Sequence, residues 1–166
     1  MSTFHLAQVN VAYARGAQDD EVMAEFIARL DEINELAQRS PGFVWRYLSD
    51  TRDPAQREFA DPLVLFNMTL WQSVEALHSF TYRTAHAQVF AARKKWFADW
   101  SDHVGKLPEL GAGMPFIALW WVPAGHVPTA AEGIAKLKLL GREGPGPEAF
   151  TFKQIFTPQG EARERQ

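Results

Sequence analysis

The chain has 166 residues, no cysteine, and a net charge of −3 from 17 basic and 20 acidic residues spread along its length. This length fits one domain with its own core, and the lack of cysteine excludes disulfides, thiolate nucleophiles and thiolate-bound metals. Because no basic face is concentrated, we expect no nucleic-acid partner. Because no run approaches about 18 apolar residues and the start does not resemble a signal peptide, we expect no membrane contact and a cytoplasmic protein.

Periodicity and capping signals predict strands and helices in alternation. The expected strands cover 3–11, 43–48, 63–71, 114–122 and 150–156, and the expected helices cover 22–37, 73–100 and 129–141. The first helix shows apolar residues at helical spacing and ends at Ser40-Pro-Gly42. A break is expected in the second helix at 81–84, and Thr129-Ala-Ala-Glu132 has capping-box spacing at the start of the third.

Two adjacent tryptophans, Trp120 and Trp121, mark a strand that needs apolar cover on both faces, because neighbouring strand side chains point in opposite directions. The order βαββαβ, followed by an added C-terminal helix and strand, predicts an α+β fold with a ferredoxin-like antiparallel sheet. Its helices would cover one face, and the bare apolar face, with Trp45, Trp120 or Trp121 on it, would pack against a second copy. We expect one domain over 1–158, forming a dimeric α+β barrel, and a frayed tail over 159–166.

Several segments carry a family resemblance. Leu70-Trp-Gln-Ser-Val-Glu-Ala-Leu77 is similar to the strand-to-helix junction of the antibiotic-biosynthesis-monooxygenase-like dimeric α+β barrels. With Phe4-His-Leu-Ala-Gln8, Ser40 to Trp45, Ala118 to Thr129 and Ala149-Phe-Thr-Phe152, it resembles an uncharacterised-domain family placed beside those barrels. The resemblance implies the fold and a homodimer. The wider superfamily implies cofactor-free oxygenation of polycyclic aromatics, haem binding or degradation, or isomerisation of small molecules, whereas the close family has no established reaction.

Strand alternation predicts a site inside the barrel. Polar side chains of the first and third strands fall on one face, and their apolar neighbours (Ala7, Val9, Val11, Phe66, Met68 and Leu70) suit the helices. The residues predicted to bind a small-molecule ligand are Gln8, Trp45, Tyr47, Asn67, Thr69, Phe80 and Trp120. Stacking and amide hydrogen bonds would hold a planar substrate. In the structural alternative, Asn10 and Asn67 bond to each other or to buried water.

His86 and Asn10 are the predicted catalytic residues. His86 shares a helix stripe with Phe90 and Phe97, and an imidazole there could act as a base or ligate iron. The resemblance to haem-degrading enzymes implies that Asn10, Phe80 and His86 would form a haem site. The segment from Trp71 to His86 is, however, about one helical turn shorter than in those enzymes, and Phe80 stands where they carry tryptophan. The alternative for His86 is a hydrogen-bonded structural residue.

His126 has two interpretations. It is either a base or ligand at the cavity mouth, where Gly125 allows close approach, or a turn histidine that bonds a nearby carbonyl before the capped helix. The sequence contains no phosphate-binding loop, no His-x-x-x-His pair and no nucleophile elbow, and we predict no metal site. The first hypothesis is therefore a cofactor-independent, monooxygenase-like enzyme acting on a flat aromatic or polycyclic molecule. The alternatives are a non-catalytic ligand-binding or dimerisation module and a haem-binding protein. Whether the protein is an enzyme stays open at this point.

Overall fold

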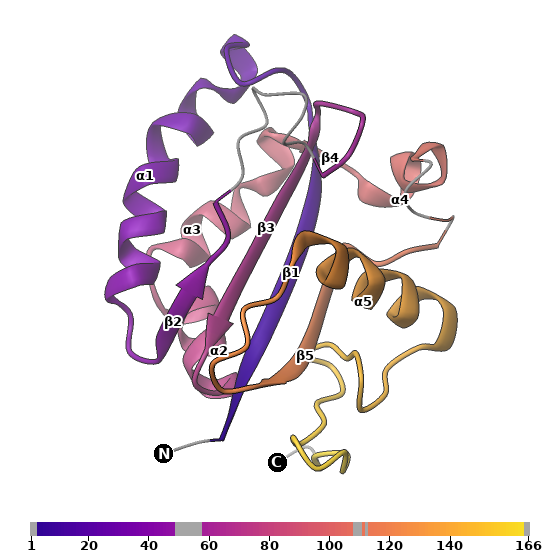
Figure 1. Cartoon of the computed structure of the whole chain (residues 1–166). Coiled ribbons are helices and arrows are strands. Elements are labelled where there is room, and N and C mark those ends of the chain that lie inside the picture. Colours follow the sequence, from indigo (N-terminus) through magenta and orange to yellow (C-terminus); the bar gives the residue numbers. More distant parts are fainter. Residues whose placement is uncertain (1–2, 49–57, 108–110, 112, 165–166) are drawn as a thin grey trace.

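The computed structural model describes residues 3–48, 58–107, 111 and 113–164. Its centre is a five-stranded antiparallel sheet (Figure 1). The strands are β1 (Phe4–Ala14), β2 (Phe43–Arg46), β3 (Val64–Trp71), β4 (Phe97–Ala98) and β5 (Ile117–Pro123). β3 pairs with one edge of β1, while β5 and β4 share its other edge, so β1 is the central strand.

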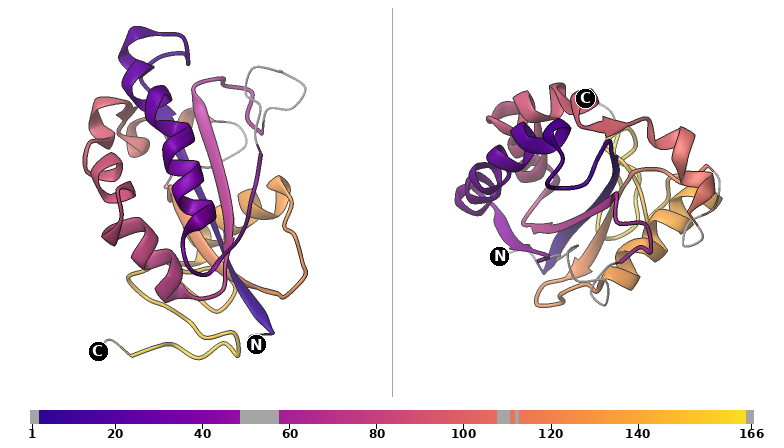
Figure 2. Two further views of the ribbon diagram at one scale, coloured as in Figure 1. Left: turned by 90° about the vertical axis from the view of Figure 1, so that its left-hand side faces the viewer. Right: turned by 90° about the horizontal axis from the view of Figure 1, so that it is seen from above.

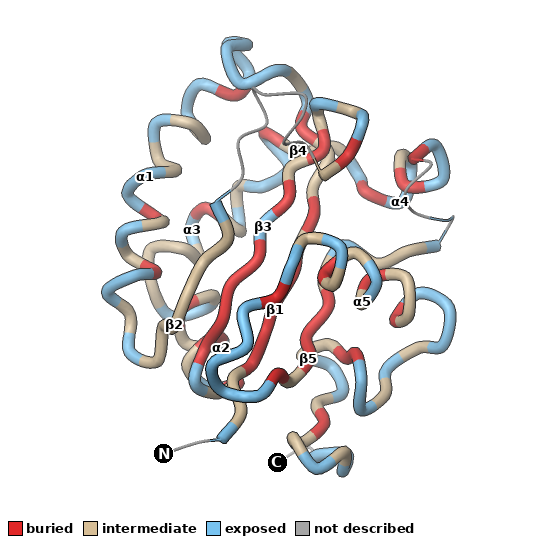
Figure 3. Tube along the Cα trace, in the orientation of Figure 1, coloured by how far each residue is buried: buried red, intermediate tan, exposed pale blue. Residues whose placement is uncertain are grey.

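Helices lie on both faces of this sheet. In the side view of Figure 2, α2 (Val74–Arg83) and α3 (His86–Ala91) lie on one side of the strands and α5 (Ala130–Glu143) lies on the other. The buried residues of α1 (Ala24–Arg39) belong to the same core cluster as those of α2 and α3. The short α4 (Trp100–His103) contributes to the cluster on the α5 side. Figure 3 shows the strands buried between these layers.

The strand register defines two faces with different side chains. Leu6 lies opposite Trp71, and the next pairs along β1 and β3 are polar: Gln8 with Thr69 and Asn10 with Asn67. We call this the amide face, and α1, α2 and α3 pack on it. The intervening side chains form what we call the α5 face, made of Ala7, Val9, Val11, Phe66, Met68, Leu70, Ala118 and Trp120.

The helices begin where the sequence offers capping oxygens. The Asp20 carboxylate accepts a hydrogen bond from the Val22 N–H in the 3-10 turn before α1. The Ser73 hydroxyl accepts from the Ala76 N–H, and the Thr129 hydroxyl accepts from the Glu132 N–H. These bonds satisfy N–H groups that a helix cannot bond internally, which explains why α2 and α5 begin at the predicted residues.

The turn after α1 depends on Gly42. Its φ is +84°, a conformation that side chains disfavour, and a Cβ atom there would come within 2.5 Å of the Ala76 Cβ. The Gly42 carbonyl also accepts a hydrogen bond from the Gln72 N–H. This close approach places the start of β2 against the start of α2. Helix α1 therefore ends before Ser40-Pro-Gly42, as predicted from the sequence.

Two predicted elements are wrong in extent. The helix expected over 73–100 breaks at Thr84, where a break was predicted, but then ends at Ala91, because a 3-10 turn and β4 follow. The strand expected over 150–156 is reduced to bridges: Phe150 exchanges two 2.8 Å backbone hydrogen bonds with Leu119, and then the chain turns. Phe150 therefore extends the sheet beside β5 by one residue only.

The expectation of a bare sheet face is also wrong. α5 covers that face, and Trp120 is only 1% exposed within a single chain. The added helix therefore buries the tryptophan that we had assigned to a second copy, and a homodimer is no longer needed for its burial.

The segment predicted to fray makes contacts where the structure describes it. The Arg163 N–H bonds to the Ile155 carbonyl, and its guanidinium pairs with Glu75 of α2 at 2.7 Å. Among the described residues, no helix is long and apolar enough to cross a bilayer.

Candidate functional site

A chain of hydrogen bonds joins the polar side chains of the amide face. The Trp71 Nε1–H donates to Thr69 Oγ1 at 2.9 Å, and the Thr69 hydroxyl donates to Gln8 Oε1 at 3.0 Å. Gln8 Nε2 donates to Asn10 Oδ1 at 2.8 Å, and Asn67 Nδ2 donates to the same oxygen at 2.9 Å. The predicted alternation thus places these amides together, and the bond between Asn67 and Asn10 is the one that the structural alternative describes.

The direction of this chain is fixed by the indole. Trp71 Nε1 can only donate, so the Thr69 oxygen accepts and its single hydrogen is left for Gln8 Oε1. Gln8 must then present its NH₂ group to Asn10, whose oxygen receives both remaining donors. The Asn10 NH₂ group and the Asn67 oxygen are left without partners among the described residues.

Burial changes along the chain. Trp71 is fully buried, and Gln8 and Thr69 are 6% and 7% exposed. Asn10 is half-buried, whereas Asn67 is exposed. The chain therefore runs from the core to the surface and ends in one donor, Asn10 Nδ2, beside one acceptor, Asn67 Oδ1. We call this donor and acceptor the amide end; it is suited to a ligand group that both accepts and donates a hydrogen bond.

Aromatic rings continue from the inner end of the chain to His86. The Trp71 and Phe80 rings stack with centroids 5.1 Å apart, and the Phe80 and His86 rings are 4.8 Å apart. Trp71 thus connects Gln8 and Thr69 to Phe80 and His86. Sequence reasoning missed Trp71 as a site residue, although the alternation that selected Asn67 and Thr69 extends to position 71.

The surroundings of His86 favour its neutral imidazole form. Burial lowers its pKa from the ordinary value of 6.5, and a hydrogen bond to the Thr81 carbonyl opposes part of that shift. Because this carbonyl, 3.1 Å from Nδ1, can only accept, Nδ1 carries the hydrogen and Nε2 has the free lone pair. His86 could therefore accept a proton, but it makes no hydrogen bond to the amides within the described part of the chain.

Three of the predicted binding residues lie on the wrong face. Trp45 and Tyr47 pack with the α5-face core, and the Tyr47 ring meets Phe66 edge to face at 5.4 Å. A register shift between Phe43 and Trp45 is the cause, since one extra residue moves later side chains to the opposite face. Trp120 is also on the α5 face, buried under α5. These three residues do not join the amides.

Tyr47 and Trp120 have structural partners on their own face. Burial raises the pKa of Tyr47 to about 12, with a further contribution from its hydrogen bond to Glu58. The Trp120 Nε1–H donates to Glu132 at 3.1 Å. His126 Nε2 lies 2.8 Å from the other Glu132 oxygen. His126 thus joins the turn before α5 to the helix itself, through a carboxylate and not the expected carbonyl.

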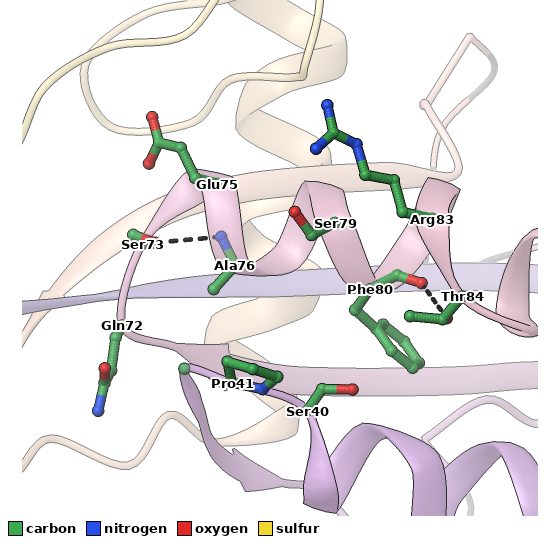
Figure 4. Close-up of a pocket in the computed structure, with 11 residues that line it drawn as sticks. Ser40, Pro41, Gln72, Ser73, Glu75, Ala76, Ser79, Phe80, Arg83 and Thr84 are labelled. Carbon is green, nitrogen blue, oxygen red and sulfur yellow. Dashed lines mark hydrogen bonds between the residues drawn. The ribbon is translucent and has the colours of Figure 1, made fainter.

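An open groove lies between the turn after α1 and helix α2 (Figure 4). Its volume is about 450 Å³. Its lining includes Ser40, Pro41 and, from α2, Ala76 and Phe80. In Figure 4 the Phe80 ring points toward Ser40 and Pro41, whereas Arg83 points away from them. Phe80 therefore lines this groove and also stacks on Trp71, whereas Gln8, Asn10 and Asn67 do not line the groove.

The described residues do not fit a haem. The tautomer of His86 suits iron ligation, but its ring is flanked by Phe80 and Phe90 and does not line the groove. No group of three His, Asp or Glu side chains in the described ranges could hold a metal ion. We therefore assign no step to haem or metal.

The fold defined by this geometry is an α+β sandwich with helices on both sheet faces. The chain belongs to a family known only as a domain of unknown function (DUF3291), whose model matches residues 5–166. This confirms the expected uncharacterised-domain family. No curated protein matches the chain.

Solved structures similar to this chain include monooxygenase-like proteins. SnoaB, a cofactor-independent oxygenase from Streptomyces nogalater, is 16% identical with a TM-score of 0.45, covering 74% of this chain and 95% of its own. A putative antibiotic biosynthesis monooxygenase from Chloroflexus aurantiacus is 15% identical with a TM-score of 0.42, covering 76% and 98%. A protein of unknown function from Nitrosomonas europaea is 12% identical with a TM-score of 0.46, covering 76% and 97%. At TM-scores below 0.5, these similarities assign no activity to the chain.

Proposed function

We propose that the protein binds a small planar molecule at the amide end. One observation carries this proposal: the buried, directional chain from Trp71 ends in the unpartnered Asn10 NH₂ group and Asn67 oxygen. In a purely structural network, we would expect every donor and acceptor to be paired within the network. This network instead presents one donor and one acceptor, in fixed orientations, near the surface. An uncharged amide at the half-buried Asn10 and another at the exposed Asn67 suit recognition of carbonyl and hydroxyl groups.

The finer proposal is a cofactor-independent, monooxygenase-like enzyme acting on a flat aromatic substrate. Asn10 Nδ2 would hydrogen-bond a substrate oxygen and stabilise negative charge that develops on it. The orientation of this donor is set in advance by Gln8, Thr69 and Trp71, so no reorganisation is needed during the reaction. His86 has no assigned role in this step, because the stacked rings of Trp71 and Phe80 link it to the inner end of the chain and not to the amide end.

The test of binding uses two planar probes of one shape, 2-naphthoate and 2-naphthamide, and isothermal titration calorimetry. We expect at least one to bind. For 2-naphthamide, whose NH₂ group can donate to Asn67 Oδ1, we expect Asn67→Ala to weaken binding by about tenfold, the equivalent of one lost hydrogen bond. Gln38→Ala is the control, because it removes an exposed amide from α1, far from the network in sequence. Binding of neither probe, or equal binding by Asn67→Ala and wild type, would contradict the proposal.

The alternative is a non-catalytic dimerisation module. Large apolar side chains remain exposed in a single chain: Leu48 at 74%, Val127 at 53% and Phe116 at 46%. A second copy could cover them, which would give the homodimer that the family resemblance implies. Sedimentation velocity at micromolar concentration tests this; a monomer would contradict it.

A further inference from the structure

Arg46 lies on the amide face beside the polar chain. It is the last residue of β2 and pairs with Thr69 of β3, so its side chain leaves the sheet on the Thr69 side. The bulge that turns Trp45 to the α5 face thereby brings Arg46 to the amide face. Arg46, Thr69 and Gln8 form one row across β2, β3 and β1, and Asn67 and Asn10 form the next row.

This arginine has no partner in the described part of the chain. Its Nε atom is buried and makes no hydrogen bond. Three other arginines have partners: Arg163 pairs with Glu75, Arg15 Nε donates to the Lys94 carbonyl, and Arg93 donates to the Phe90 carbonyl. Among the arginines that the structure describes, Arg46 is distinguished by a buried Nε without a partner. Arg46 as a whole is half-buried, and leaving its buried Nε–H unpaired is unfavourable, so this donor indicates a missing acceptor.

The neighbours on the amide face cannot supply that acceptor charge. Gln8, Asn10 and Asn67 are neutral, and their oxygens on the inner side of the network are occupied. The diagonal neighbour of Arg46 on the adjacent strand β3 is Asn67, and such neighbours are about 7–8 Å apart at their Cα atoms, within reach of a long side chain. Asn10 lies one strand further, opposite Asn67. The Arg46 guanidinium and the Asn10 NH₂ group are thus donors on either side of Asn67, and a ligand group with two oxygens that lies over Asn67 can meet both.

We infer that the ligand of the amide end carries an anionic oxygen, as a planar carboxylate or an enolate does, and that Arg46 binds it. This inference rests on the proposed function and adds the charge of the ligand to it. Arg46 would provide charge-assisted hydrogen bonds, while Asn10 Nδ2 donates to the same group and Asn67 Oδ1 accepts from an adjacent hydroxyl or amine. Arginine suits this role because its planar fork matches a carboxylate.

The two probes separate this inference from the proposed function. 2-Naphthoate carries the anionic carboxylate and 2-naphthamide replaces it with a neutral amide of the same shape. At pH 7.5 and low salt we expect wild type to bind the carboxylate about tenfold more tightly than the amide, as charge-assisted bonds are about twice as strong as neutral ones. Arg46→Met should remove this preference. Arg39→Met, at an exposed position in the last turn of α1, should keep it.

The outcomes are distinguishable. Equal binding of both probes by wild type would overturn the anionic ligand but leave the proposed function standing, and binding of neither would overturn both. A carboxylate preference that survives in Arg46→Met would overturn the role of Arg46. Folding of the variant is checked by thermal unfolding: without ligand, we expect Arg46→Met to melt no lower than wild type, because it removes an unpaired buried donor. Arg46→Gln is the second variant if Arg46→Met fails to fold, and the comparison of probes on wild type needs no variant.

Discussion

Each face of the sheet holds a buried tryptophan whose indole N–H donates a hydrogen bond, but the two partners differ. On the α5 face, Trp120 donates outward to Glu132, a partly exposed carboxylate at the rim. On the amide face, Trp71 donates to Thr69, which is itself buried and extends the chain of hydrogen bonds to Gln8. One face is an apolar core with its polar group at the edge, and the other carries polar groups through its interior.

The comparison indicates that one face of the sheet contributes mainly to stability and the other to ligand binding. A polar group at the rim can exchange its partner for water, so little depends on it. A polar group in the interior has no such substitute, so each member of the amide chain fixes the orientation of the next. The α5 face therefore serves mainly stability, whereas the amide face sets the direction of two groups at the surface.

The largest effect is expected from Leu137, which is fully buried where α5 packs on the sheet. Leu137→Ala should lower the free energy of unfolding by about 2–5 kcal/mol, through lost apolar contact and a cavity, with no change in probe affinity. Urea denaturation measures it. Leu139→Ala, a half-buried neighbour on the same helix, should cost less. Equal losses in the two variants would contradict the packing of α5 described above.

Thr69→Val breaks the amide chain at its centre without changing the shape of the side chain. The Trp71 N–H and the Gln8 oxygen both lose their partner in a buried position, so we expect a loss of about 1–3 kcal/mol. The control is Thr81→Val, whose hydroxyl bonds only to the Leu77 carbonyl within α2. A loss no larger than in this control would show that the chain is not a buried network.

Glu132→Gln tests the rim of the α5 face. The amide can still accept from Trp120, so only the contact with His126 is weakened. Because both side chains are partly exposed, at 45% for His126 and 27% for Glu132, we expect a loss of only about 0.2–1 kcal/mol. A loss as large as that of Thr69→Val would remove the distinction between the two faces.

His86 gives the amide side a pH dependence of stability. Its pKa in the folded protein is lowered by burial below the ordinary 6.5, so below that pH the unfolded chain binds more protons and the folded state is destabilised. Above it both states are neutral and the effect vanishes. We expect wild type to lose melting temperature as the pH falls from 7.5 to 5.5 and His86→Gln to lose less. His78→Gln, at an exposed position of α2, should behave like wild type.

The sequence predicts the amide face better than its surroundings. Strict alternation on β1 and β3 is a local property, so Gln8, Asn10, Asn67 and Thr69 could be placed together. β2 has only four residues and contains a bulge, so the alternation of its side chains cannot be recognised in the sequence. For this reason Trp45 was predicted on the wrong face and Arg46 was not considered. Capping and periodicity predict where α5 begins and ends. They do not predict which face of the sheet the helix covers, because that depends on tertiary packing.

The direction of the amide chain supports the central claim that its end binds a ligand, and the side-chain NH₂ resonances of Asn10 and Asn67 report on it most directly. In a ¹⁵N-labelled sample titrated with 2-naphthoate, we predict that both NH₂ signals shift, with that of Asn10 moving furthest because its NH₂ group is the one left free. The NH₂ signal of Gln38 on α1 should stay in place. If the Asn10 and Asn67 signals do not move while probe is bound elsewhere, or if no signal moves at all, the account is contradicted.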